Sequence, residues 1–424
     1  MKINLKKFIF GAAMTVSMLT TLLVPVSAAT TYTPVAGTSC NFNKYLIMDA
    51  GDSVPNATFS FTVAPGAARS ADTSDNAVMQ VLPGVGTPTI ADVTFAPGDA
   101  TATAAGSNID VARDQEDRTG TAGTDTVQLD AGEKYATKQA TVSFSGITFN
   151  EPGIYRYIIT ETASATHAAA GIIHDTDTDR VLDVYVTDDG SGALVVSGYV
   201  LHTDDDDVVI NNNMGSADVA AAAAALDDKT DGFTNEYDSK DLKVEKEVTG
   251  NQASRDKWFE FTVTATNIAD EDSYVVSIAD DNDTNTNDGS ADATSGNTAA
   301  TIAANQGKTN PTTVTGAQLK AGQKFYLQHG QSVVIRGLAP NAGYTVTENA
   351  EDYKSAVKSG DTNTGTIGTV AGTAKMAVAG FTNTRDGIIP TGIIVSVAPY
   401  VGLLMIGVIG LAVVMASKKR KTAM

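Results

Sequence analysis

The chain has 424 residues, which is long enough for two or three domains. Its 49 acidic and 29 basic residues give a formal net charge of −20, which argues against nucleic acid as a partner. Cys40 is the single cysteine, so no intrachain disulfide can form, and a secreted fold would need another form of stabilisation.

The N-terminus has the pattern of a secretory signal peptide. Several lysines precede an apolar run over residues 8–26, and small residues follow at Ser27 and Ala28. Polar residues and Pro25 interrupt the apolar run, which favours a cleaved signal over a membrane anchor. We therefore expect residues 1–28 to be removed on export.

Alternating apolar and polar residues, bounded by Gly, Asp and Asn, predict β-strands along the rest of the chain. The predicted strands lie at residues 59–63, 140–144, 181–186 and 193–196 in the first half, and at 259–263, 324–327, 332–335 and 344–348 in the second. Residues 187–192 predict a hairpin turn. Long amphipathic helices are not expected, and residues 220–226 favour a short helical turn at most.

The two halves follow one plan, which indicates a duplication. Short strands with regular turns predict an all-β chain with two tandem immunoglobulin-like β-sandwich domains, over residues 29–238 and 239–386. Two segments dense in Thr, Asn, Asp, Ala and Gly, at residues 98–131 and 280–312, predict surface loops.

Each half also contains a lysine, a glutamate and an asparagine in the same order. The lysine precedes the first phenylalanine-rich strand, the glutamate closes a tyrosine-containing strand, and the asparagine ends a Gly-Phe-Thr-Asn sequence. The first trio is Lys44, Glu161 and Asn235, and the second is Lys246, Glu348 and Asn383.

Strand alternation turns the six side chains toward the apolar face. Lys246 shares a face with Val244 and Val248, and Lys44 shares one with Phe42. A single inward lysine is more often a rim residue whose charged end reaches water. The same trio in the same order in both halves favours burial instead.

Burial of the trio predicts a chemical reaction within it. An apolar site disfavours charge, so we expect a neutral amine on the lysine and a protonated acid on the glutamate. The amine is then a nucleophile, the acid can move a proton to departing ammonia, and folding holds the reactants together. The expected product is a Lys–Asn isopeptide bond formed with the autocatalytic help of Glu161 or Glu348. Because each bond forms once, the protein is not expected to be an enzyme.

The C-terminal residues 387–424 carry a further signal. Pro390, Thr391 and Gly392 precede an apolar stretch over residues 393–416, which is long enough to span a bilayer, and a basic tail follows. This arrangement resembles the cell-wall sorting signal of Gram-positive surface proteins, in which a sortase cleaves between threonine and glycine. A plain single-pass membrane anchor is the alternative.

The repeated trio ahead of a sorting signal resembles the pilin isopeptide-linkage family of Gram-positive major (backbone) pilins. The implied cross-links are Lys44–Asn235, assisted by Glu161, and Lys246–Asn383, assisted by Glu348. The resemblance also implies a secreted subunit of a pilus that is covalently attached to peptidoglycan at the cell surface. Its implied partners are identical subunits, pilin-polymerising and wall-anchoring sortases, and accessory pilins.

The resemblance further implies head-to-tail polymerisation, in which a sortase joins Thr391 of one subunit to a lysine in the N-terminal domain of the next. In this family the acceptor lies shortly before the last strand of that domain, where Lys229 stands. Lys134 and Lys138 remain the alternatives, because Lys44 is assigned to the interior.

Other signals are weaker. Residues 281–285 hint at a calcium loop, but Thr286 and Asp292 stand where an EF-hand needs Gly and Glu. The four histidines show no ligand spacing, so neither a metal nor a cofactor is expected. The alternative function is a monomeric wall-anchored adhesin, or a tip or base subunit of a pilus, which would call for an additional ligand-binding domain.

Overall fold

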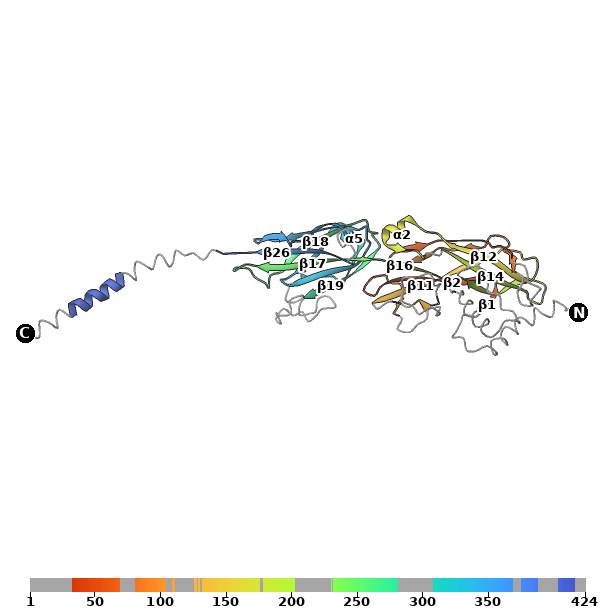
Figure 1. Cartoon of the computed structure of the whole chain (residues 1–424), viewed down its shortest axis with the longest axis horizontal. Helices are drawn as coiled ribbons and strands as arrows, with labels where there is room; N and C mark the ends of the chain where they lie inside the picture. Colours follow the sequence, from red (N-terminus) through yellow and green to blue (C-terminus); the bar gives the residue numbers. More distant parts are fainter. Residues whose placement is uncertain are drawn as a thin grey trace, which may run out of the picture.

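The computed structural model describes residues 33–68, 81–103, 109–110, 126–127, 129, 132–175, 178–202, 230, 232–280, 308–368, 375–387 and 403–415. Within these ranges the chain is mostly β-structure, and two β-sheet domains follow one another along the long axis (Figure 1). The prediction of an all-β chain with two sheet domains is confirmed.

The N-terminal domain contains two large sheets. One joins β1 (Thr33–Gly37), β15 (Leu194–His202), β14 (Asp179–Asp188), β12 (Gly153–Glu161) and β4 (Phe61–Pro65), with β5 (Val81–Pro83) beside β12. The other joins β13 (Ile172–Ile173), β16 (Gly232–Tyr237), β2 (Ser39–Asp49), β11 (Glu133–Ser143) and β6 (Thr89–Ile90), with β8 (Thr101–Ala102) beside β11. Two short pairs are β3 (Ala57–Phe59) with β7 (Val93–Phe95), and β9 (Ile109–Asp110) with β10 (Thr126–Val127).

The C-terminal domain repeats this plan. One sheet joins β20 (Thr313–Thr315), β19 (Ser273–Asp280), β22 (Gln331–Leu338), β17 (Lys240–Thr249), β26 (Met376–Thr384) and β24 (Lys354–Val357). The other joins β21 (Gln323–Leu327), β18 (Phe259–Thr266), β23 (Gly343–Asn349) and β25 (Thr364–Thr366). In both domains the first long strand therefore lies beside the last one.

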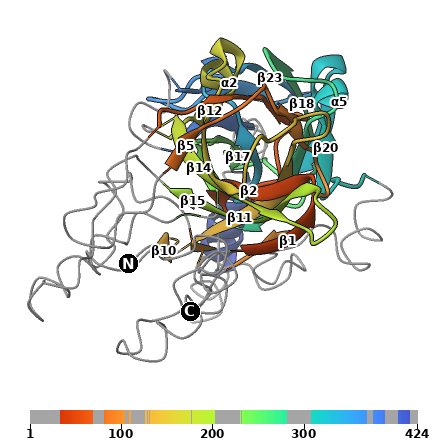
Figure 2. The same cartoon turned by 90° about the vertical axis from the view of Figure 1, so that its right-hand side faces the viewer.

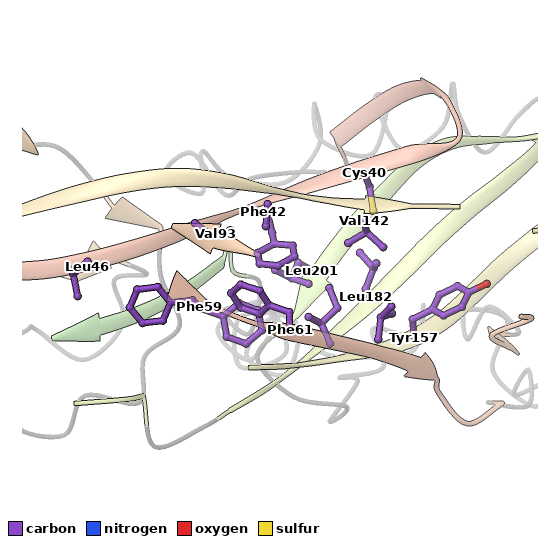
Figure 3. Close-up of a cluster of buried hydrophobic side chains, with 14 of the residues drawn as sticks. Cys40, Phe42, Leu46, Phe59, Phe61, Val93, Val142, Tyr157, Leu182 and Leu201 are labelled. Atoms are coloured by element: carbon purple, nitrogen blue, oxygen red, sulfur yellow. The ribbon is translucent and has the colours of Figure 1, made fainter. Parts of the chain in front are cut away.

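The core of each domain fills the space between its two sheets with alternate side chains. In the N-terminal domain Phe42 packs edge-on against Phe61 at a ring-centroid distance of 5.1 Å (Figure 3). Phe42 also packs edge-on against Phe233 at 5.4 Å. In the C-terminal domain Phe261 packs edge-on against Phe381 at 5.4 Å. Edge-to-face packing of this kind suits the charge distribution of aromatic rings.

Two short helices were not expected from the sequence. These are α2 (Ala165–Ala170) and α5 (Gly316–Ala321), and both lie toward the top of the end-on view in Figure 2. Ser164 caps the start of α2, and Gly171 ends it with a positive φ of 85°. A side chain at Gly171 would also lie 2.6 Å from Pro340 of the other domain, so this glycine is required by close approach as well as by conformation.

The two domains are in direct contact. β16 ends at Tyr237 and β17 begins at Lys240, so little chain separates them. The Tyr237 hydroxyl donates a hydrogen bond of 2.6 Å to the Gly337 carbonyl, and the Ser239 hydroxyl donates to the Asp52 carboxylate. This junction buries polar groups from both domains, and each is hydrogen-bonded across the boundary.

Most predicted strands lie within observed ones, and the predicted turn at 187–192 joins β14 to β15. The predicted strand at 59–63 is instead divided between β3 and β4, because Ser60 belongs to neither. Residues 1–28 and 220–226 lie outside the described residues. Residues 403–415 form an exposed apolar helix, and no helix in the described part of the chain has both the length and the hydropathy for a bilayer span.

Candidate cross-linking sites

Strand pairing brings the lysine and the asparagine of the first trio onto neighbouring strands. β2 and β16 are parallel, with Lys44 opposite Phe233 and Asn235 opposite Leu46. Positions two apart in a strand share a face, so Lys44 and Asn235 point to the same side of the sheet. Both residues are fully buried.

The second trio has the same register. β17 and β26 are also parallel, with Lys246 opposite Phe381 and Asn383 opposite Val248. In each domain the lysine therefore faces the phenylalanine of Gly-Phe-Thr-Asn, and the asparagine lies two positions further along the last strand. This common register is a structural property of both domains.

The glutamates come from the opposite sheet. Glu161 on β12 pairs with Phe61 of β4, and Glu348 on β23 pairs with Phe261 of β18. These two phenylalanines occupy matching places in the Phe-x-Phe-Thr-Val sequences of the two domains. Each carboxylate thus reaches across the sandwich to the lysine and asparagine of the facing sheet.

In the N-terminal site the three groups are in hydrogen-bond contact. The Lys44 Nζ atom lies 2.6 Å from Glu161 Oε2, and the Asn235 amide nitrogen donates to Glu161 Oε1 at 2.5 Å. The Lys44 Nζ atom also lies 4.6 Å from the centroid of the Phe59 ring, which is within cation–π range. The site is closed on its apolar side by this ring.

The C-terminal site has a similar layout with one difference in geometry. The Lys246 Nζ atom lies 2.6 Å from Glu348 Oε1, but off the angle of a hydrogen bond, so the pair interacts as neighbouring charges. The Asn383 amide nitrogen donates to Glu348 Oε1 at 2.8 Å, and the Phe259 ring centroid lies 4.4 Å from Nζ.

Burial makes both lysines unusually acidic. It lowers the pKa of Lys44 from 10.5 to about 8, against the opposing effect of the Glu161 charge, and lowers the pKa of Lys246 to about 8 in the same way. An amine with this pKa loses its proton far more readily than a surface lysine. The expectation of amines that are easily made neutral agrees with these values.

The expectation of a protonated acid is wrong for Glu161. Burial alone would raise the pKa of this carboxyl, but the Lys44 charge and hydrogen bonds from His174, Lys44 and Asn235 outweigh burial and lower it to about 2. Desolvation favours the protonated acid, but the attraction between two groups buried together is stronger here. The resting N-terminal site is therefore an ion pair, and the reaction would begin with transfer of a proton from Lys44 to Glu161.

The sequence missed two groups in the N-terminal site. The ring nitrogen His174 Nδ1 lies 2.9 Å from Glu161 Oε1, and the Asp175 backbone N–H donates to the Asn235 carbonyl oxygen at 3.2 Å. The spacing of the histidines along the sequence bears only on metal binding and does not point to this contact. The short sequence distance between Glu161 and His174, across the segment that contains α2 and β13, is the signal that could have identified this histidine.

The C-terminal site has different neighbours in these places. The Ser355 hydroxyl donates to Glu348 Oε2 at 2.7 Å. The side-chain carbonyl oxygen of Asn383 is buried, and within the described ranges it accepts no hydrogen bond. No histidine contacts Glu348 in that part of the chain.

The alternative acceptor lysines of the N-terminal domain are both engaged. Lys134 donates to the backbone carbonyl of Asp52, while Lys138 donates to the Thr94 carbonyl at 2.6 Å and lies 2.8 Å from the Asp99 carboxylate. Lys229 and the sorting motif at residues 390–392 lie outside the described residues, as does the predicted loop at 281–285. The described part of the chain holds no cluster of three or more metal-ligating side chains.

The chain is similar to several known proteins. Residues 41–238 match the family model described as a Spy0128-like isopeptide containing domain, and residues 240–385 match one described as a domain of unknown function (DUF7601). A pilin of Streptococcus pyogenes serotype M1 is 26% identical over 286 residues, which are 65% of this chain and 70% of that protein.

Two solved structures were also matched. The major pilin from Streptococcus pyogenes has a TM-score of 0.46 and 21% identity, over 83% of this chain and 100% of that one. The major pilin protein T-13 from Streptococcus pyogenes serotype GAS131465 has a TM-score of 0.42 and 21% identity, over 84% and 100%.

Each of the two β domains thus holds a lysine, a carboxylate and an asparagine buried together. Its N-terminal domain is a Spy0128-like isopeptide-containing domain. Taken as a whole, the chain is similar to a pilin of Streptococcus pyogenes.

Proposed function

We propose that this protein is the backbone subunit of a covalently polymerised pilus, and that a Lys–Asn isopeptide bond closes each of its two domains. The observation that carries the proposal is the identical register of the two trios, with Lys44 opposite Phe233 and Lys246 opposite Phe381. The proposed domain limits are 29–238 and 239–386.

The proposed reaction is a condensation that releases ammonia. Glu161 takes a proton from the Lys44 ammonium, and the neutral amine then attacks the side-chain carbonyl carbon of Asn235. A carbon–nitrogen bond forms to Nζ, the bond to the amide nitrogen breaks, and that nitrogen leaves as ammonia after gaining a proton. Lys246, Glu348 and Asn383 would react in the same way.

Several physical factors support this reaction. Holding reactants in contact can replace roughly 7–11 kcal/mol of an activation barrier. The lowered pKa of each lysine makes its amine available near neutral pH. The product is an uncharged amide, so condensation also removes a buried ammonium, which is costly to keep away from water.

Polymerisation is proposed to proceed from Thr391 of one subunit, after sortase cleavage before Gly392, to Lys229 of the next. The contacts of Lys134 and Lys138 support this choice, because each ammonium is already held by acceptors within its own domain. Wall-anchoring sortases would then attach the pilus to peptidoglycan. The subunit would be secreted and displayed at the cell surface.

The intact mass of the purified ectodomain tests the intramolecular bonds. We expect the loss of two ammonia molecules from the wild-type chain, and of one from either Glu161→Ala or Glu348→Ala. Lys243→Ala is the matched control, because Lys243 lies on β17 but pairs with Glu245 at 2.7 Å outside the site. Recovery of Lys246 and Asn383 in separate proteolytic peptides of the folded wild-type protein would refute the proposal for that domain.

The acceptor is tested in cells by the detergent-resistant ladder of pilus polymers. A Lys229→Ala strain should lose the ladder while its monomer still shows both internal bonds by mass. Lys134→Ala and Lys138→Ala strains serve as controls and should retain it. An unchanged ladder in the Lys229→Ala strain would exclude this acceptor.

A further inference from the structure

The two sites differ in the groups that surround the asparagine. In the N-terminal site, the segment after α2 and β13 brings His174 and Asp175 against Asn235. His174 Nδ1 lies 3.2 Å from the Asn235 amide nitrogen, which is the nitrogen that would leave, and 2.9 Å from Glu161 Oε1. The C-terminal site has the Ser355 hydroxyl on its glutamate, and in the described part of the chain no imidazole contacts Glu348 or Asn383. His329 accepts from the Val248 backbone N–H at 2.9 Å and lies near Lys246 instead.

The three contacts around His174 require a shared proton. Glu161 Oε1, His174 Nδ1 and the Asn235 amide nitrogen lie within 3.2 Å of one another. A carboxylate oxygen and an unprotonated ring nitrogen would repel each other at 2.9 Å. A proton must therefore sit on His174 Nδ1 or on Glu161 Oε1, directly beside the nitrogen that would leave.

A second histidine fixes the orientation of the first. His167 Nδ1 lies 3.0 Å from His174 Nε2, and the two rings are stacked with centroids 5.1 Å apart. The backbone of Thr58 forms a hydrogen bond with the His167 ring that favours its protonated form, as a carbonyl acceptor does. His167 can then accept from His174 Nε2–H, which leaves His174 Nδ1 to exchange a proton with Glu161 and Asn235.

We propose that His174 is a catalytic residue of the N-terminal cross-linking reaction, which donates a proton from Nδ1 to the amide nitrogen of Asn235 as that nitrogen leaves. The backbone N–H of Asp175 polarises the carbonyl that Lys44 attacks and stabilises the developing oxyanion. His167 is a positioning residue. This proposal rests on the proposed isopeptide function and assigns the first domain a mechanism that the second does not share.

The protons balance in this scheme. Glu161 takes one proton from the Lys44 ammonium and keeps it. The adduct between Lys44 and Asn235 loses a second proton from Nζ, which replaces the one that His174 gives to the leaving nitrogen. Ammonia departs with its two amide hydrogens and the proton from His174, and the imidazole ends as it began.

Several charged and titratable groups lie around the N-terminal site. They are Lys44 on β2, Glu161 on β12, His167 on α2 and Asp175 beside His174, with Arg180 on β14 acting on Lys44 and Asp175. Arg180 forms an ion pair with Asp175 at 2.8 Å, and the Phe59 ring covers the remaining side. The His174 side chain is 13% exposed, so it can exchange protons with solvent.

The two domains of one chain allow an internally controlled test. Full-length chains isolated in urea before either bond has formed would be diluted into folding buffer between about pH 5.5 and 7.5, the range in which an imidazole titrates. Mass spectrometry of the branched peptides would give the rate of each bond. The ratio of the N-terminal to the C-terminal rate should fall as the pH rises, because only the N-terminal reaction uses a protonated imidazole.

His174→Gln retains a polar side chain but cannot titrate. We expect this variant to form the N-terminal bond about 100-fold more slowly, as for loss of a general acid, with a rate ratio that no longer depends on pH. The C-terminal rate should be unchanged. Ser355→Ala is the matched control for the other site and should leave the N-terminal rate unchanged.

The outcomes separate this inference from the proposed function. Absence of both bonds in the wild-type chain would refute the isopeptide function itself. Formation of both bonds with a wild-type N-terminal rate in His174→Gln would overturn only the role of His174. If His174→Gln does not fold, the wild-type chain still tests the proposal. A ratio of N-terminal to C-terminal rate that stays constant over the pH range would contradict the role of His174.

Discussion

At Lys44, burial and a neighbouring carboxylate act on one ammonium in opposite directions. Loss of water favours the neutral amine, and the Glu161 charge favours the ammonium, with a net pKa of about 8. The same pair holds the Glu161 pKa at about 2. The unreacted N-terminal domain therefore contains a buried ion pair at neutral pH, and condensation removes the ammonium from it.

This ion pair predicts acid sensitivity in a chain that cannot react. In Asn235→Ala the Lys44–Glu161 pair persists, and its contribution to stability is present above the ordinary glutamate pKa of 4.5 and lost as the pH falls toward about 2. A pKa difference of this size corresponds to about 3 kcal/mol in the free energy of unfolding. Urea denaturation at several pH values measures this loss.

The wild-type N-terminal domain is the comparison for this measurement. Once the bond has formed, Nζ carries no charge, so the acid-dependent loss assigned to the ion pair should be absent. Equal acid dependence in the wild-type and Asn235→Ala chains would contradict the assignment of the titration to this pair.

Strand alternation made the inward direction of the six side chains in the two trios predictable. Along β17 the burial pattern alternates residue by residue, which is the pattern that placed Lys246 with Val244 and Val248. The parallel pairing of the first and last long strands did not follow from alternation. Parallel neighbours are joined by a long connection, here the rest of the domain, and no local pattern specifies such a pairing.

The segment after β12 was not predictable by these means. α2 is only six residues long and is defined by its caps, Ser164 and Gly171, rather than by an apolar stripe. His174 follows it outside any long strand, so no periodicity assigns it a direction. The role of His174 depends on the meeting of β2, β16 and the segment after β13 at Glu161. Only the folded structure shows that these three segments meet there.

At the scale of the elements, each proposed cross-link would join the first long strand of a domain to its last. The bonds would enclose roughly 190 residues in the N-terminal domain and roughly 140 in the C-terminal one, and the loop-entropy relation for cross-links gives about 5 kcal/mol for either. Asn383→Ala should therefore lower the C-terminal unfolding midpoint by roughly 10–20 °C. Scanning calorimetry measures this shift.

Thr382→Ala is the control for that prediction. Thr382 is the strand neighbour of Asn383, and its hydroxyl donates to Glu247 at 2.9 Å. Loss of such a bond costs about 1 kcal/mol. Similar midpoints for Asn383→Ala and Thr382→Ala would show that the covalent tie contributes little.

At the scale of the whole molecule, the junction between the domains contains a carboxyl group that is poorly suited to ionise. Burial raises the pKa of Asp52 to about 6, although the hydrogen bond from Ser239 acts in the other direction. A carboxyl with a raised pKa in the folded protein destabilises that state above this pKa, and the penalty disappears below its ordinary value of 3.8.

Asp52→Asn should therefore stabilise the chain at neutral pH. The pKa difference sets an upper limit of about 3 kcal/mol, because the amide keeps an acceptor for Ser239 and carries no charge. Calorimetry of both proteins across the pH range measures the difference, which should shrink to nothing below about pH 4. A stabilisation that is independent of pH would mean that the charge of Asp52 is not its cause.

The close succession of β16 and β17 has a mechanical consequence. With both bonds formed, a covalent route runs from Lys44 to Asn235, along the short junction to Lys246, and then to Asn383. A pulling force applied to the two ends of the chain travels along this route and bypasses nearly all of both sandwiches. Under tension such a subunit could lengthen only in its short connecting segments, so a filament built from it would behave as a nearly inextensible cable.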